Sequence, residues 1–150
     1  MTSKSKFESR RRARRRALQA LYQWHLTGQD ASQILIQFHE EQDFSNVDDE
    51  LFTRLVNRIC AGQKDIDEKI TPFLDRPLSQ LDVIEHVILS IGAYELLHTI
   101  EVPHQVVIDE AVNLAKQFGA EQGHSYINGV LDKAAQQWRD PATLSPLNPT

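Results

Sequence analysis

Six arginines lie within seven consecutive positions near the start of the chain, in the run Arg10–Arg16 that only Ala13 interrupts. A guanidinium group is always charged, and its paired N–H donors match the oxygens of a phosphate. Cations at the N-terminal end of a helix do not help that helix, because they face the positive end of its macrodipole and repel one another. A basic cluster that lowers the stability of its own helix therefore indicates that the arginines bind an anionic partner.

The charge of the chain is divided unevenly along its length. The formal net charge is −5, which taken alone argues against a nucleic-acid partner. Residues 1–16, however, contain eight basic side chains against Glu8 alone, whereas the remainder contains eight basic and twenty acidic side chains. One basic end on an acidic protein is the pattern of a localised polyanion site.

The arginine run leads directly into the apolar helical pattern of residues 17–24. At about 100° per residue, Arg10 and Arg14 fall on one side of this helix. Arg12 and Arg16 fall on another side, so we expect about half of the arginines to contact phosphate. The alternative is a solvated arm, but the acidic remainder already provides solubility.

A second candidate is the polar stretch 119–126, which precedes a predicted helix. The free amides of a helix N-terminus can bind an anion, and the ring of Tyr126 can stack on a base. On composition alone, an ordinary turn with Tyr126 packed in the core is favoured. Gly129 lies inside the helical pattern, where glycine costs about 1 kcal/mol against alanine. A glycine at position 129 therefore predicts that another helix packs closely against it.

No set of residues has the spacing of a catalytic or metal site. Cys60 is the only cysteine, which excludes an internal disulfide, and it falls beside an apolar stripe where a thiol is usually inert. We therefore expect no enzyme activity, no cofactor and no metal. The residues considered for catalysis are Glu85, His86, His98, His104, Asp109 and Glu110.

The periodicity predicts an all-α fold, since no segment alternates long enough to be a strand. Asp30 or Ser32 can cap the second helix, and Asp82 a strongly apolar fourth one. Glycine should bend the third helix at Gly62. The predicted helices are 10–26, one following residue 30, one from Asp48 or Asp49 to near Pro72, one following Asp82, 106–118 and 125–138.

Pro77 is the best candidate for a boundary between subdomains, because proline disfavours helix in the residue before it. We therefore predict a flexible N-terminus over 1–9, helical subdomains over 10–76 and 77–139, and a disordered proline-containing tail over 140–150. Neither a signal peptide nor a membrane span of about 20 apolar residues is evident, so a cytoplasmic location is expected.

Several motifs in register carry a family resemblance. They are the basic run with Ala20-Leu21-Tyr22, Ala93-Tyr94-Glu95-Leu96, Val102-Pro103, residues 110–116 and residues 128–133. Over roughly residues 9–139 the sequence closely resembles the NusB family of bacterial transcription antitermination factors.

The resemblance implies about seven helices in two packed helical bundles, without catalysis. It also implies binding of single-stranded boxA RNA together with NusE, which is also a small-subunit ribosomal protein, and read-through of ribosomal RNA operons by RNA polymerase. The implied RNA-binding residues are Arg10, Arg11, Arg12, Arg14, Glu121, Gln122, His124, Ser125 and Tyr126. The implied NusE-binding residues are Tyr22, Phe73 and Glu85.

Two alternatives remain at this point. NusB-like domains also occur fused to RNA methyltransferases, but no Gly-rich cofactor loop or catalytic cysteine motif is present in these residues. The arginines could instead contact an acidic protein or a membrane surface. Charge reversal at Arg11 and Arg14 that spared RNA binding but abolished partner capture would favour this adaptor role.

Overall fold

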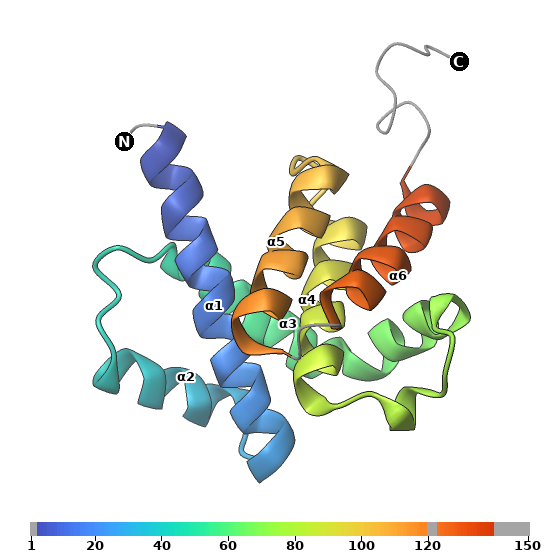
Figure 1. Cartoon of the computed structure of the whole chain (residues 1–150). Helices are drawn as coiled ribbons and strands as arrows, with labels where there is room; N and C mark the ends of the chain where they lie inside the picture. Colours follow the sequence, from blue (N-terminus) through green and yellow to red (C-terminus); the bar gives the residue numbers. More distant parts are fainter. Residues whose placement is uncertain (1–2, 120–122, 140–150) are drawn as a thin grey trace. The chain divides into compact units, whose positions relative to one another are not determined.

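A computed structural model describes residues 3–119 and 123–139 of the chain (Figure 1). Within them it contains six α-helices, two short 3₁₀ helices and no strand, which confirms the all-α prediction. The chain divides into two compact units, residues 1–63 and 64–150, and each is described by itself. The division falls within a helix after Gly62, rather than at Pro77. The predicted tail over 140–150 lies outside the described residues.

The first unit begins with α1, Ser3–Thr27, which starts seven residues before the predicted position. Local side-chain pairs support the additional turns. The Arg11 guanidinium lies 5.1 Å from the centre of the Phe7 ring, and Arg12 Nη2 lies 3.9 Å from the Glu8 carboxylate one turn away. The helix ends before Gly28, whose φ of +73° is in the left-handed region that favours glycine.

The other helices of this unit begin and bend where the sequence predicts. Asp30 is the N-cap of α2, Ala31–Glu41. Asp48 caps the next helix, α3, Asp49–Ile70, by accepting a hydrogen bond from the Leu51 amide at 3.0 Å. The helix is kinked at Gly62, which has non-helical angles (φ −114°, ψ 18°). It is followed by the 3₁₀ helix η1, Thr71–Phe73, confirming its predicted end near Pro72.

The second unit is organised around α4, Val83–His98, after the 3₁₀ helix η2, Leu78–Gln80. Asp82 caps α4 by accepting a 2.7 Å hydrogen bond from the Glu85 amide, as predicted. The ten consecutive residues Val87–Leu96 are all buried, so α4 is enclosed on every side. Its neighbours are α5, His104–Phe118, and α6, Gly123–Trp138, and both pack against it (Figure 1).

The two glycines in the helices of this unit differ in their surroundings. A Cβ on Gly92 would lie 2.7 Å from Leu131 Cδ1, so α4 and α6 approach each other closely at this position. A Cβ on Gly129 would meet nothing within 4 Å. The close helix contact predicted for Gly129 was therefore wrong. It occurs instead at Gly92, with Leu131 two residues away from Gly129 on the partner helix.

A buried arginine that sequence analysis did not single out closes the second unit. Arg139 is 3% exposed, and its guanidinium donates to the carbonyl oxygens of Leu96 at 2.8 Å and Val102 at 2.9 Å. Longer bonds reach the Glu95 and Thr99 carbonyls. Burial lowers the pKa of this guanidinium from its usual value, although an arginine keeps its charge. The side chain thus satisfies carbonyls at the C-terminal end of α4.

Candidate nucleic-acid interface

The arginines of α1 form the candidate site in the first unit. Arg10, Arg11 and Arg12 are half-buried, so part of each guanidinium reaches solvent. Arg10 Nε lies 3.7 Å from the Asp48 carboxylate, and the Arg11 guanidinium covers the Phe7 ring. Partly exposed ion pairs of this kind are weak, typically under about 1 kcal/mol. Arg10 and Arg12 can therefore exchange these ion pairs for an external anion.

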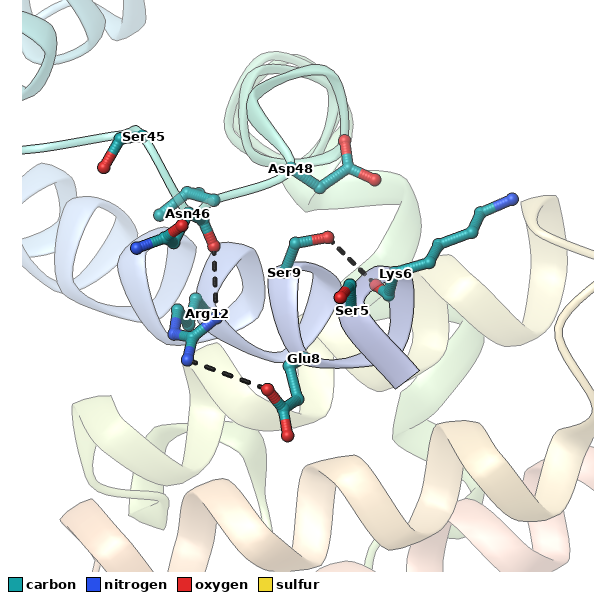
Figure 2. A pocket seen from close by; sticks show the side chains of 9 residues that line it. Ser5, Lys6, Glu8, Ser9, Arg12, Ser45, Asn46 and Asp48 are labelled. Carbon is teal, nitrogen blue, oxygen red and sulfur yellow. Dashed lines mark hydrogen bonds and ion pairs between the residues drawn. The ribbon is translucent and has the colours of Figure 1, made fainter. Parts of the chain in front are cut away.

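Two arginines one turn apart hold the connection between α2 and α3. Arg16 Nη1 donates to Gln42 Oε1 at 2.7 Å, and its guanidinium lies 5.4 Å from the centre of the Phe44 ring. Arg12 Nη1 donates to the Asn46 carbonyl oxygen at 3.4 Å, as Figure 2 shows. The prediction that Arg12 and Arg16 share one side of the helix is thereby confirmed. Arg16 has a structural role that its position in the run did not reveal.

The middle of the run is more enclosed. Arg14 is 3% exposed, and Arg15 Nε is buried without a hydrogen-bond partner in the described part of the chain. A direct phosphate contact by Arg14, as implied by the family resemblance, does not fit this burial. The helical pattern explains the difference, since Arg14 lies between Ala13 and Ala17, which are both 0% exposed. We therefore limit the phosphate-binding proposal to Arg10, Arg11 and Arg12.

The second part of the predicted RNA surface lies at the start of α6. His124 and Tyr126 are half-buried and Ser125 is exposed, all within the first turn of that helix. Glu121 and Gln122 lie outside the described residues. This first turn belongs to the second unit, whereas the arginines belong to the first unit.

Arg76 contacts Tyr126 and was missed by sequence analysis. Its guanidinium lies 4.2 Å from the centre of the Tyr126 ring, a distance typical of a cation–π contact. The Asp75 carboxylate accepts from Arg76 Nε at 2.8 Å, and this hydrogen bond lowers the pKa of Asp75. Burial raises the pKa of the Tyr126 phenol. One face of the ring is thus occupied by Arg76, a pairing across 50 positions that no local spacing could indicate.

The three residues predicted to bind a protein partner have different environments. Tyr22 is 36% exposed on α1 in the first unit. In the second unit, Phe73 packs edge-on against Trp138 with ring centres 5.5 Å apart. Glu85 forms a capping box at the start of α4, where its Oε1 accepts from the Asp82 amide at 3.4 Å. Glu85 thus stabilises its own helix in addition to any external contact.

The residues considered for catalysis are engaged in structural contacts. His86 Nε2 lies 2.7 Å from the Asp67 carboxylate, and Asp109 accepts from the Gln105 amide. Burial raises the pKa of the Cys60 thiol to about 11, so the thiol stays protonated and unreactive near neutral pH. Among the described residues, no group of three or more histidine, cysteine, aspartate or glutamate side chains is arranged to hold a metal ion. In that same part of the chain, no helix is both long and apolar enough to cross a membrane.

The fold and the site define a protein that is all-helical in its described residues and whose first helix carries three consecutive half-exposed arginines, Arg10, Arg11 and Arg12. The sequence pattern of the NusB family matches residues 11–136. The chain is 48% identical over 130 residues to the transcription antitermination protein NusB of Xanthomonas axonopodis pv. citri, covering 87% of this chain and 82% of that protein. The corresponding protein of Xanthomonas euvesicatoria pv. vesicatoria is also 48% identical over 87% of this chain and 80% of its own.

A solved structure of NusB from T. maritima has a similar fold. It superimposes with a TM-score of 0.76 at 28% sequence identity, covering 89% of this chain and 94% of that chain. The chain therefore belongs to the NusB family.

Proposed function

We propose that the chain is an RNA-binding transcription antitermination factor. It binds boxA-type single-stranded RNA together with NusE and promotes read-through of ribosomal RNA operons by RNA polymerase. The observation that supports this proposal is the row of half-exposed guanidinium groups of Arg10, Arg11 and Arg12 in a chain of this family. The role requires no cofactor and no catalysis.

The arginines supply attraction that does not depend on RNA sequence. The internal polar partners of Arg10 and Arg12 are held at 3.4 to 3.9 Å, so exchanging these contacts for phosphate costs little. Each neutralised phosphate releases counterions, which makes affinity fall as salt rises. With about three phosphates neutralised, log K should fall against log salt with a slope of about −2 for a single strand.

The first turn of α6 provides the base contacts in this proposal. His124 and Ser125 offer hydrogen-bonding groups, together with Glu121 and Gln122 in the adjacent segment. Tyr126 can stack on a base through the ring face that Arg76 does not cover. Specificity for boxA then comes from this part, and general affinity from α1.

The test is a fluorescence-anisotropy titration of boxA-type RNA and a scrambled RNA of the same composition, with and without NusE. Arg11→Ala should weaken binding to both RNAs about 5-fold and reduce the salt slope by about 0.7. Arg58→Ala removes one exposed cation from α3 of the same unit and serves as the matched control. Equal affinity of wild type for both RNAs in the presence of NusE, or binding that does not respond to salt, would contradict the proposal.

The NusE-binding surface is tested separately. Tyr22, Phe73 and Glu85 are the proposed contacts, and Glu85→Gln removes the charge while keeping an acceptor for the capping box. This variant should lower NusE affinity without lowering helical stability. Since binding couplings are reciprocal, it should also reduce the gain in RNA affinity that NusE provides. Unchanged NusE binding in both Tyr22→Ala and Glu85→Gln would remove this surface from the proposal.

A further inference from the structure

A polar pocket lies beside the first turns of α1. It is lined by α1 residues between Ser5 and Arg12 and by the connection Ser45–Asp48, and its volume is about 800 Å³ (Figure 2). This volume is within the range of small-ligand sites. Of its nine lining residues only Val47 is apolar. The lining therefore suits a polar ligand with several hydrogen-bonding groups.

The charges around the pocket favour an anionic group on that ligand. Both acidic side chains of the lining face arginines: Glu8 lies 3.9 Å from Arg12, and Asp48 lies 3.7 Å from Arg10. The Lys6 ammonium is exposed, and the described residues give it no ion-pair partner. Lys6 is thus the cation that an incoming phosphate can take without displacing an internal carboxylate.

The wall opposite α1 is held in place before any ligand arrives. The Asp48 amide donates to the Ser9 carbonyl oxygen at 3.0 Å, and the Ser45 amide donates to the Asp43 carboxylate at 2.8 Å. The Asn46 carbonyl oxygen accepts from Arg12. These bonds use the backbone, whereas the side chains of Ser45 and Asn46 are exposed. The Ser45 hydroxyl is also bonded to Asp43, which leaves the Asn46 amide as the exposed side-chain group of this wall. A preformed wall lowers the entropy cost of binding.

We propose that this pocket binds single-stranded RNA, with the Asn46 amide at the edge of one unstacked base and the Lys6 ammonium, which points away from Asn46 (Figure 2), at a phosphate further along the strand. The inference rests on the proposed RNA-binding function and deepens it. An unstacked base exposes donors and acceptors on its edges, and an amide side chain presents one of each, a pairing best known for adenine. The first unit would then contribute base recognition in addition to attraction by its arginines.

Asn46→Ala is the decisive variant, because it removes the amide and leaves the backbone carbonyl that holds Arg12. In the anisotropy titration it should weaken binding of boxA-type RNA about 10-fold, with the salt slope unchanged because no charge is lost. The matched control is Asn57→Ala, an exposed asparagine on α3 of the same unit. It should bind RNA as wild type does.

Lys6→Ala tests the phosphate contact. It should weaken binding and also reduce the salt slope by about 0.7, as expected for one lost phosphate contact. In wild type, the side-chain amide resonances of Asn46 should shift on addition of the RNA, whereas those of Asn57 should not. This spectroscopic measurement does not depend on the folding of any variant.

The outcomes separate this inference from the proposed function. Normal RNA affinity of Asn46→Ala together with weakened affinity of Arg11→Ala would overturn the pocket and leave the general function standing. Wild-type protein that binds no RNA would overturn both. An equal loss of affinity in Asn46→Ala and Asn57→Ala would also overturn the pocket, because the loss would then not be specific to it.

Discussion

Arg139 in the second unit and Arg10–Arg12 in the first are held in opposite ways. In the second unit Arg139 is enclosed, and four backbone carbonyls accept its hydrogen bonds. In the first unit Arg10, Arg11 and Arg12 remain half-exposed, and the carboxylate partners of Arg10 and Arg12 lie at longer distances. A guanidinium whose donors are all satisfied inside the protein stabilises the fold and offers nothing to a ligand. One held by weak contacts can exchange them for phosphate.

The two units also differ in the contacts that hold their helices together. In the second unit α4 is buried on all sides, with α5 and α6 packed on it. The first unit has an apolar core that includes Leu21 and Phe52, but polar side chains also link its elements, including the pair of Gln23 and Gln37 at 2.9 Å between α1 and α2. Ligand binding is therefore expected in the first unit, where polar contacts within the protein can be exchanged for contacts with a ligand. The predictions below test this difference.

Removal of Arg139 should have the largest effect. Arg139→Ala removes the side-chain donor from the Leu96 and Val102 carbonyls in a buried position, whereas Glu95 and Thr99 keep backbone donors, and it should lower the free energy of unfolding by about 3 kcal/mol. Arg139→Lys should recover part of this loss, because one ammonium cannot reach all four carbonyls. Urea denaturation followed by circular dichroism measures both. A midpoint equal to that of wild type would contradict the capping role.

Alanine at Gly92 should have the next largest effect. Its Cβ would lie 2.7 Å from the buried Leu131 side chain, so overpacking should cost about 1 to 3 kcal/mol, partly offset by the higher helix propensity of alanine. Gly129→Ala is the matched control, because its Cβ enters open space and gains only the propensity. The two variants should differ in unfolding free energy by about 2 kcal/mol. Equal stability would show that α4 and α6 can separate without cost.

Removal of Arg16 should have a smaller and more local effect. Arg16→Ala loses one hydrogen bond to Gln42 and one cation–π contact with Phe44, together about 1 kcal/mol. Hydrogen exchange at the Asp48 amide should become faster, because the connection loses a tether. Arg58→Ala should leave this exchange unchanged. Unchanged exchange in Arg16→Ala would show that the connection does not depend on α1.

The smallest effect should appear with pH at His39. Its Nε2 lies 2.6 Å from the Asp49 carboxylate, and this hydrogen bond raises the pKa of His39 above 6.5. A raised pKa stabilises the folded state at low pH, and the contribution is lost as pH rises through the folded-state pKa. The stability difference between wild type and His39→Gln should therefore be larger at about pH 5.5 than at about pH 8.5. A difference independent of pH would contradict it.

The predictable features were those with a local cause. Asp82 as a cap, the bend at Gly62 and the stop at Gly28 each follow from the conformational or hydrogen-bonding preference of one residue type. The apolar run of α4 indicated a central helix, which the structure confirms. The family resemblance was carried by motifs that the comparisons confirm over residues 11–136.

The features that were missed depend on residues far apart in sequence. Arg76 meets Tyr126 across 50 positions, and Arg139 meets Leu96 across 43. The burial of Arg14 likewise could not be predicted from the basic run, because its half-exposed neighbours are also arginines. The wrong prediction for Gly129 has a related cause. A glycine within the helical pattern indicated a close contact between helices near Gly129, but the contact is made by Leu131 against Gly92 on another helix, which the sequence around Gly129 does not reveal.

The capping of α4 by Arg139 also sets an order of events during synthesis. A ribosome adds Leu96 43 residues before it adds Arg139, whose side chain donates to the Leu96 carbonyl. The contacts of Arg10, Arg12 and Arg16 with residues 42–48, in contrast, can form once Asp48 has emerged. The arginines of α1 can therefore gain these partners while the second unit still lacks its last helix.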